Sequence, residues 1–301
     1  MTVSEKRSAE EIVRLIVPED GQISPVCSRS RGVALLLHGL YDSPYIMKDL
    51  GALFNSLCFS TRFLLLPAHG TQPGDMVNNN YDAWSDAVTY AVKSLTRDYS
   101  GQPVYLIGFS TGGALAIQQA QKPGKRIKGM LLFAPLLELR SSSVAGAGFF
   151  GLFSKYVQRQ AEIDTFKYES TTVNSVMQAN DLAKTVRAGL EEKALEVPVF
   201  LAAARNDYTL PTNIAITMFN QGRFGKDSYL VLFSPQGSEG QTLRSCDEND
   251  HANILHAKGH SIECNSRFTI SQDGQGYHIN DFSHMSLTLR PDNPHYGLNG
   301  A

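Results

Sequence analysis

The residues of this chain best suited to chemistry are GFSTG at 108–112, which fit the pattern G-x-S-x-G. An apolar run at 104–107 precedes them, and a helix-like stretch begins at Gly113. A tight turn between a buried strand and a helix lifts the serine hydroxyl to the carboxyl edge of the sheet, and the flanking glycines remove side chains that would clash there. The pattern predicts that Ser110 is a nucleophile. The alternative is a glycine-rich turn in which Ser110 caps the helix.

A serine nucleophile of this kind requires an acid and then a histidine, later in the chain and in that order. Asp207, in AAARNDYTLP, follows an apolar run and is the expected acid; a turn role for Asp207, with Glu138 as the acid, is the alternative. His284 in DFSHMSL is the expected base. The rival is His260 in AKGHSI, whose surroundings resemble the body of an insert rather than the edge of the main sheet. Ser110, Asp207 and His284 are then nucleophile, orienting acid and general base.

Charge that develops on a carbonyl oxygen under attack needs backbone donors, the oxyanion hole. The N–H of Thr111, directly after the nucleophile, is the first expected donor. The second is the N–H of Leu40, in the sequence HGL that follows the apolar run at 33–37. His38 precedes the other candidates in the chain, so we interpret it as a structural histidine that braces this loop.

The elements that must position these groups alternate along the chain. Continuous apolar runs, typical of strands covered on both faces, are separated by amphipathic stretches, which predicts an α/β fold with a mostly parallel sheet. Strands are expected at 33–37, 62–66, 104–107, 130–134, 199–203 and 229–233. Helices are expected at 45–57, 81–95, 113–121 and 212–220.

Two long segments interrupt this alternation. Residues 136–196 contain the apolar, glycine-rich stretch VAGAGFFGLF and then polar helical sequence, and we interpret them as a cap over the sheet. The apolar stretch is expected to line a pocket; the alternative is docking on a membrane. Residues 235–283 are polar and rich in turns, with a possible hairpin at HSIEC and SRFTI. The 301 residues fit a single α/β domain, 1–301, that contains both insertions.

Composition and charge exclude several classes of protein. The formal net charge is −2 and no basic stripe is present, so a nucleic-acid partner is not expected. No run approaches the roughly 18 to 20 apolar residues of a membrane span, and the charged N-terminal sequence lacks the apolar core of a secretory signal. Three histidines lie beside two aspartates in one polar segment, but their spacing matches no standard metal site, so no metal is expected. These five residues are Asp247, Asp250, His251, His256 and His260.

Several motifs in a fixed order resemble the α/β-hydrolases, among them the bacterial carboxylesterases and monoacylglycerol-lipase-like enzymes. They are LLLHGL at 35–40, LPAHGTQPGDM at 66–76, YDAWSDAV around Trp84, GFSTGG at 108–113 and Asp-x-x-x-Pro at 207–211. The resemblance spans about 30–220. It implies an α/β-hydrolase fold: a doubly wound, mostly parallel sheet with a helical cap at 136–196. It also implies that His69-Gly70 shapes the site, and that no metal or organic cofactor takes part.

The function that the resemblance implies is hydrolysis of a small-molecule carboxylic acyl ester. A peptidase, a thioesterase or an acyltransferase on the same fold is an alternative, because the fold does not determine the substrate. A non-catalytic binding protein of the same fold is a further alternative, against which the presence of all three types of triad residue argues.

The four cysteines are expected to form two pairs, Cys27 with Cys58 and Cys246 with Cys264. The resemblance places the strands after Cys27 and Cys58 side by side, and the other two bracket the second insertion. Paired cysteines favour an extracytoplasmic protein. The alternative is four buried thiols in a cytoplasmic one.

Overall fold

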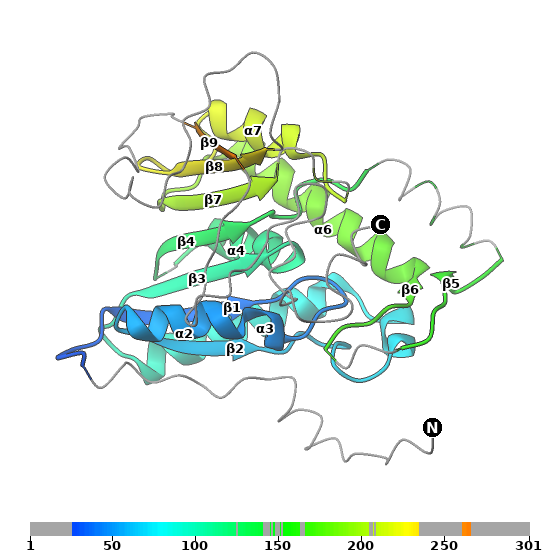
Figure 1. Cartoon of the computed structure of the whole chain (residues 1–301), viewed down its shortest axis with the longest axis horizontal. Helices are drawn as coiled ribbons and strands as arrows, with labels where there is room; N and C mark the ends of the chain where they lie inside the picture. The colour runs from blue at the N-terminus through cyan, green and yellow to red at the C-terminus, as the bar shows by residue number, and fades with distance from the viewer. Residues whose placement is uncertain are drawn as a thin grey trace.

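A seven-stranded parallel sheet lies at the centre of the protein (Figure 1). The computed structural model describes residues 26–234, apart from 125, 141–144, 146, 148–150, 152, 163–165, 205, 206 and 208, and it also describes 261–265. For 233, 234 and 261–265 only the backbone is described. The strand order is β2-β1-β3-β4-β7-β8-β9, so the chain winds outward from β1 in both directions. The expected doubly wound α/β fold is therefore confirmed.

The six predicted strands are all present, at bounds close to those expected. They are β1 (Gly32–Leu37), β2 (Phe59–Leu64), β3 (Val104–Phe109), β4 (Ile127–Phe133), β7 (Val199–Ala204) and β8 (Tyr229–Ser234). β4, expected at 130–134, begins three residues earlier, and the largest error is β2, which was expected at 62–66 and both begins three residues and ends two residues earlier. This strand lies at the edge of the sheet and most of its residues are only half-buried, so its apolar residues did not mark its start.

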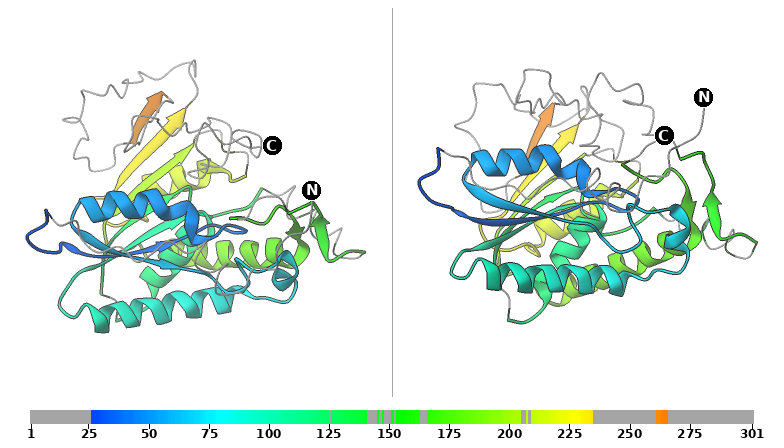
Figure 2. Two further views of the ribbon diagram at one scale, coloured as in Figure 1. Left: turned by 60° about the horizontal axis from the view of Figure 1, so that its bottom comes forward. Right: turned by 90° about the horizontal axis from the view of Figure 1, so that it is seen from below.

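Helices cover both faces of the sheet. They are η1 (Pro44–Met47), α2 (Lys48–Ser56), η2 (Pro73–Val77), α3 (Tyr81–Asp98), α4 (Thr111–Gln121), α6 (Val173–Glu192) and α7 (Thr212–Asn220). Helix α2 lies on one face and α3 on the other (Figure 2). Alternate residues of β1 serve the two cores: Ala34 and Leu36 pack with α2, while Leu35 and Leu37 pack with α3 and α4.

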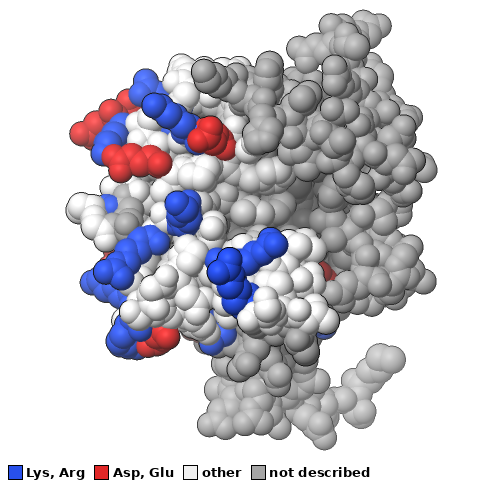
Figure 3. Space-filling model, turned by 90° about the vertical axis from the view of Figure 1, so that its left-hand side faces the viewer, with Lys and Arg blue, Asp and Glu red and all other residues white. Residues whose placement is uncertain are grey.

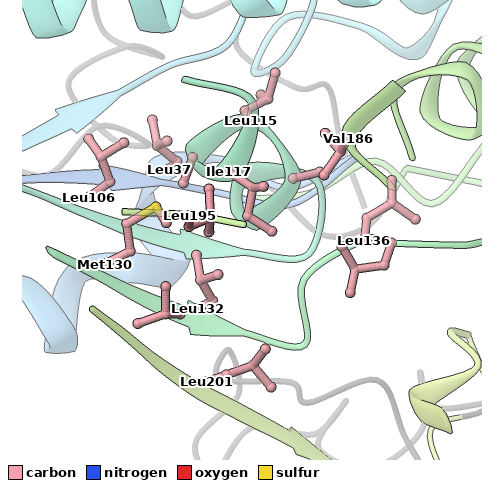
Figure 4. Close-up of a cluster of buried hydrophobic side chains, with 14 of the residues drawn as sticks. Leu37, Leu106, Leu115, Ile117, Met130, Leu132, Leu136, Val186, Leu195 and Leu201 are labelled. Carbon is pink, nitrogen blue, oxygen red and sulfur yellow. The ribbon is translucent and has the colours of Figure 1, made fainter. Parts of the chain in front are cut away.

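The larger core lies on the face that α3, α4, α6 and α7 cover. Val186 of α6 packs there with Leu115 and Ile117 of α4 over the strand residues of the sheet (Figure 4). Trp84 is fully buried in the same core, and its Nε1 donates to the carbonyl of Pro67 at 3.1 Å.

Helix α6 forms the second part of the segment interpreted as a cap, 136–196. It packs on the face of the sheet, where Leu182, Val186 and Leu190 are buried. The described chain before α6, with its antiparallel pair β5 (Tyr156–Gln158) and β6 (Thr171–Thr172), lies beyond the carboxyl ends of the main strands (Figures 1 and 2). We therefore propose that a cap is confined to the residues before α6.

A seventh strand corrects the interpretation of the second insertion. Residues HSIEC were expected to start a hairpin in the body of the insert. Instead, β9 (Ser261–Asn265) pairs in parallel with β8 and extends the main sheet. A short strand without a long apolar run indicates an edge position but not which strand it pairs with, so the sequence pattern could not distinguish the two arrangements. The second arm, SRFTI, lies outside the described residues, so the hairpin itself and the extent of the insertion, 235–283, stay predictions.

A disulfide joins the chain before β1 to the chain before β2. Cys27 and Cys58 are bonded, with their Cα atoms 5.6 Å apart, which confirms the first predicted pair. The N–H of Arg31 also donates to the carbonyl of Cys58 at 2.8 Å. The second predicted pair, Cys246 with Cys264, lies outside what is described, since Cys246 is not described and Cys264 is described by its backbone alone.

Removing the first disulfide is expected to lower the free energy of unfolding by about 3 to 4 kcal/mol, because the bond closes a loop across a sequence separation of 31 residues in the unfolded chain. The measurement is urea denaturation of the Cys27→Ser, Cys58→Ser double variant against the wild type. Titration of the denatured, unreduced wild type should find at most two free thiols. Four thiols, or an unchanged free energy of unfolding, would contradict the prediction.

The amino edge of the sheet carries exposed charges of both signs (Figure 3). Arg29 and Arg31 lie before β1, and Arg126 and Lys128 lie at the start of β4; all four are exposed. Every main-sheet strand is parallel, so the carboxyl ends lie together at the opposite edge, where the predicted site residues follow their strands. None of the helices in the described ranges combines the length and the apolarity that crossing a membrane requires.

Candidate active site

Ser110 has a backbone conformation that is uncommon for any residue but glycine. It lies between β3 and α4 with φ 52° and ψ −117°. Such a conformation costs about 1 to 3 kcal/mol and persists where the surroundings enforce it. The strand β4 and the chain after it do so here: the N–H of Ser110 donates to Phe133, and the carbonyl of Ser110 accepts from the N–H of Leu136, both at 3.0 Å. The sharp strand-to-helix turn expected from the sequence is therefore present.

The glycines of the turn allow backbones to approach closely. A Cβ on Gly112 would lie 2.2 Å from the carbonyl oxygen of Leu37 and 2.6 Å from that of His38. A Cβ on Gly108 would lie 2.6 Å from the backbone nitrogen of Gly113. The expectation that side chains at these two positions would clash is confirmed. The first contact also shows that the start of α4 packs directly against the loop after β1.

Ser110 does not cap the helix that follows it. It occupies the N-cap position of α4, but its side chain makes no capping hydrogen bond. Its side chain is largely buried, with 8% of the residue surface exposed. The alternative reading of Ser110 as a helix-capping residue is therefore wrong.

The loop after β1 packs against the same turn. A Cβ on Gly39 would lie 3.0 Å from a ring carbon of Phe109, the residue before Ser110. His38 is fully buried, and its Nε2 accepts from the N–H of Leu66 at 3.1 Å while its Nδ1 lies 2.8 Å from the carbonyl of Gly39. The expected bracing role of His38 is confirmed. Both of its ring nitrogens contact the backbone, so it is unavailable as a general base.

A second buried histidine lies beside the first. The rings of His38 and His69 are 4.9 Å apart, edge to face. Burial, reinforced by the neighbouring His69, lowers the pKa of His38 well below its ordinary value, and burial lowers the pKa of His69 to about 4. Both rings are neutral at pH 7. They are the two histidines in the described part of the chain, and the other six lie outside it.

Tyr168, in the segment before α6, contacts the loop that contains His69. Its hydroxyl accepts from the N–H of Thr71 at 2.8 Å and donates to the carbonyl of Ala68 at 3.0 Å, and its ring lies parallel to that of His69 at 6.5 Å. Tyr168 was not among the predicted site residues. About a hundred residues separate it from this loop, and no local pattern marks such a contact.

Asp207 is buried just after β7. Its Oδ1 accepts from the N–H groups of Thr209 and Leu210 at 2.7 and 2.9 Å, and the residue is 1% exposed. The guanidinium of Arg140, another residue that the sequence analysis missed, donates to the Asp207 carbonyl. These bonds show that Asp207 does shape a turn, and they hold its carboxylate in one orientation, which an orienting acid requires.

The alternative acid, Glu138, is engaged elsewhere. Its carboxylate forms an ion pair with Arg187 of α6, and its side chain is 39% exposed. An exposed, paired carboxylate is a poorer orienting group than a buried one held by backbone N–H groups. The contacts therefore favour Asp207 over Glu138.

Ser110 and Asp207 lie at the same edge of the sheet. β4 lies between β3 and β7, so two strand spacings, about 10 Å in total, separate the ends of these strands. An imidazole fits between a hydroxyl and a carboxylate at such a separation. Both candidate bases, His284 and His260, lie outside the described residues.

The course of β9 bears on the choice between the two histidines. Ser261, at its start, pairs with Leu230, and Asn265, at its end, pairs with Ser234. The chain thus comes into β9 from the amino edge, directly after position 260, and leaves it at the carboxyl edge, where Ser110 lies. Position 284 follows that exit. β9 belongs to the main sheet, so the interpretation of the residues around His260 as the body of an insert was wrong, but the direction of β9 favours His284.

The described residues contain no group of three metal-ligating side chains. The polar segment with His251, His256 and His260 lies outside them. The expectation that no metal or organic cofactor is needed stays a prediction.

Known proteins resemble this chain over part of its length. The family model described as serine aminopeptidase, S33, matches residues 28–214. Human monoglyceride lipase is 41% identical over 71 residues, and the match covers 23% of each chain. The thermostable monoacylglycerol lipase of Bacillus sp. (strain H-257) is 22% identical over 191 residues, which are 62% of this chain and 74% of that enzyme. The chain thus aligns with about a quarter of the length of the human relative.

A solved structure shares the fold. A soluble variant of monoglyceride lipase from Saccharomyces cerevisiae superposes with a TM-score of 0.60 at 13% identity, covering 70% of this chain and 80% of that one. At this identity the likeness establishes the α/β-hydrolase fold and nothing finer.

Proposed function

The chain belongs to the serine aminopeptidase S33 family of α/β-hydrolases, and from this premise we propose that it hydrolyses carboxylic acyl esters through Ser110, Asp207 and His284. The observation that carries the proposal is the backbone of Ser110, held at positive φ between β3 and α4 and packed against the loop after β1. Proteins retain such strain mainly at functional sites.

The proposed reaction has two steps. The Ser110 hydroxyl attacks the acyl carbonyl while His284 takes its proton, and the N–H groups of Leu40 and Thr111 stabilise the oxyanion. The intermediate collapses, His284 protonates the departing alcohol, and an acyl-enzyme remains. Water, deprotonated by His284, then attacks the acyl-enzyme; the second intermediate collapses, His284 returns the proton to the Ser110 oxygen, and the carboxylic acid is released. Asp207 orients the imidazole in both steps.

The substrate class that we propose is an ester with one acyl chain of short to medium length, such as a monoacylglycerol. The support comes from the two relatives whose names state a monoacylglycerol substrate, and from the apolar stretch VAGAGFFGLF of the proposed cap. Acyl pockets are mostly apolar with few polar groups. The family's description favours a second candidate, a peptidase that removes N-terminal residues.

The experiment that tests the proposal compares purified protein on p-nitrophenyl esters of rising chain length, on monoacylglycerols and on aminoacyl p-nitroanilides. We expect turnover of the esters, with a maximum at short to medium chain length, and none of the anilides. Cleavage of the anilides in preference to the esters would favour the peptidase.

Replacing the proposed acid is expected to slow ester turnover strongly. Asp207→Asn should lower kcat by about four orders of magnitude, the loss measured for the equivalent change in a well-studied serine protease, because the amide favours the wrong imidazole tautomer. The matched control is Glu138→Gln, which breaks the ion pair with Arg187 and should lower kcat less than tenfold. Steady-state kinetics on one ester settles the assignment, and a larger loss for Glu138→Gln would reverse it.

A further inference from the structure

Tyr41, directly after the proposed oxyanion donor Leu40, has a backbone conformation that its residue type disfavours. Its φ is 67°, in the left-handed region that is rare for large side chains. The turn itself supplies little support, because the N–H of Asp42 donates to the carbonyl of Gly39 at a long 3.3 Å. Other contacts must therefore hold this conformation.

Hydrogen bonds from the region where α6 begins hold Tyr41, among them a side-chain bond with Thr171. The N–H of Tyr168 donates to the carbonyl of Tyr41 at 2.7 Å. The hydroxyl of Tyr41 lies 2.6 Å from the Oγ of Ser175, which is in the first turn of α6. Because Ser175 Oγ donates its own proton to the carbonyl of Thr172, the Tyr41 hydroxyl is the donor to Ser175; burial raises the pKa of Tyr41 to about 12, so this hydroxyl is protonated at neutral pH.

Ser175 is itself fixed. It is 1% exposed, its Oγ donates to the carbonyl of Thr172 at 2.8 Å, and its N–H donates to the Oγ1 of Thr172 at 3.2 Å. Thr172 is the N-cap of α6 and is fully buried. The Tyr41 hydroxyl is thus bonded to the first turn of α6, and the other end of that helix packs in the core.

We propose that Tyr41 is a positioning residue: its bonds to Ser175 and Tyr168 fix the turn that presents the Leu40 N–H to the oxyanion. This inference rests on the proposed function. Gly39 packs on Phe109, so the strand-to-helix turn at Ser110 fixes one side of the Leu40 turn. Tyr41 fixes the other side. The peptide between Gly39 and Leu40 is then held from both ends.

An oxyanion forms only as the carbonyl is attacked, so a misplaced donor lowers kcat and leaves substrate binding unchanged. Tyr41→Phe and Ser175→Ala each remove the same hydrogen bond. We expect each to lower kcat for an ester about tenfold, with KM within twofold of wild type. The affinity for a boronic acid inhibitor, which forms a tetrahedral adduct with the serine, should fall by the same factor as kcat. The double variant should lose less than the product of the two single losses, because both single variants remove the bond between Tyr41 and Ser175, although Ser175→Ala also removes the bond of its Oγ to Thr172.

Tyr81→Phe is the matched control. The hydroxyl of Tyr81 also faces a hydroxyl of α6, Thr185 Oγ1, at 3.4 Å, but Thr185 lies about 15 Å along the helix from Ser175. Its kcat and its affinity for the inhibitor should equal those of the wild type. Circular dichroism and urea unfolding of all variants show that each is folded.

Three results would overturn the inference while leaving the proposed function intact: wild-type kcat in Tyr41→Phe and Ser175→Ala, a rise in KM at constant kcat, or independent losses that multiply in the double variant. A wild-type protein that turns over no ester and binds no boronic acid would instead overturn the proposed function, and this inference with it.

Discussion

Ser110→Ala is expected to lower kcat for ester hydrolysis by about six orders of magnitude, the loss that follows removal of the nucleophile in a well-studied serine protease. Without the hydroxyl no acyl-enzyme forms, and only slow attack by water remains. The fold should be unaffected, because alanine keeps the Cβ that the strained backbone already accommodates and the Ser110 side chain makes no capping bond to α4. The measurements are kcat on one p-nitrophenyl ester and the free energy of unfolding in urea.

A matched control separates the loss of a nucleophile from the loss of a buried hydroxyl. Ser85 is also buried, and its Oγ accepts from Lys122 at 2.9 Å, between α3 and α4. Ser85→Ala should retain activity within a few-fold. A fluorophosphonate should label wild-type protein at Ser110 alone, as mapped by mass spectrometry, and should not label Ser110→Ala. Activity of Ser110→Ala above a hundredth of wild type would reject the assignment.

The parts of the fold that the sequence predicted well are those with a strong local signal. Strands buried on both faces are continuous apolar runs, and β1, β3 and β7 were placed within two residues at each end. Helix α7 was predicted at its observed bounds, 212–220, because Pro211 precedes it. The start of β2 is set by pairing rather than by hydrophobicity, since Phe59 pairs with Gly32. A pattern within one segment contains no information about its partner.

The candidate site likewise contains residues that the sequence could predict and others that it could not. Ser110, Leu40 and Asp207 each follow a predicted strand, so a parallel sheet brings them to one edge, and sequence reasoning could find them. The groups that hold them could not be found. Tyr41 contacts Ser175 across 134 residues of sequence, and Arg140 contacts Asp207 across 67. Such pairs form because the connection from β4 through α6 to β7 brings distant residues together. No short sequence motif encodes that connection.

His284→Ala is expected to lower kcat about as far as Ser110→Ala, because a nucleophile and its base act as one unit. The loss of the double variant should not exceed that of either single variant, again because the two groups serve one step. The same kinetics on one ester measure all three proteins. Added imidazole should restore part of the activity of His284→Ala, since it supplies a base of the same chemistry, and none to Ser110→Ala.

His260→Ala is the control for this assignment. The chain comes into β9 at the amino edge of the sheet and leaves it at the carboxyl edge, because β9 is parallel to β8. A base must come within hydrogen-bond reach of the Ser110 hydroxyl, which lies at the carboxyl edge. A residue directly before Ser261 is therefore a poor candidate, whereas position 284 follows the exit from β9. Near wild-type kcat is expected for His260→Ala; destruction of activity there, together with its survival in His284→Ala, would assign the base to His260.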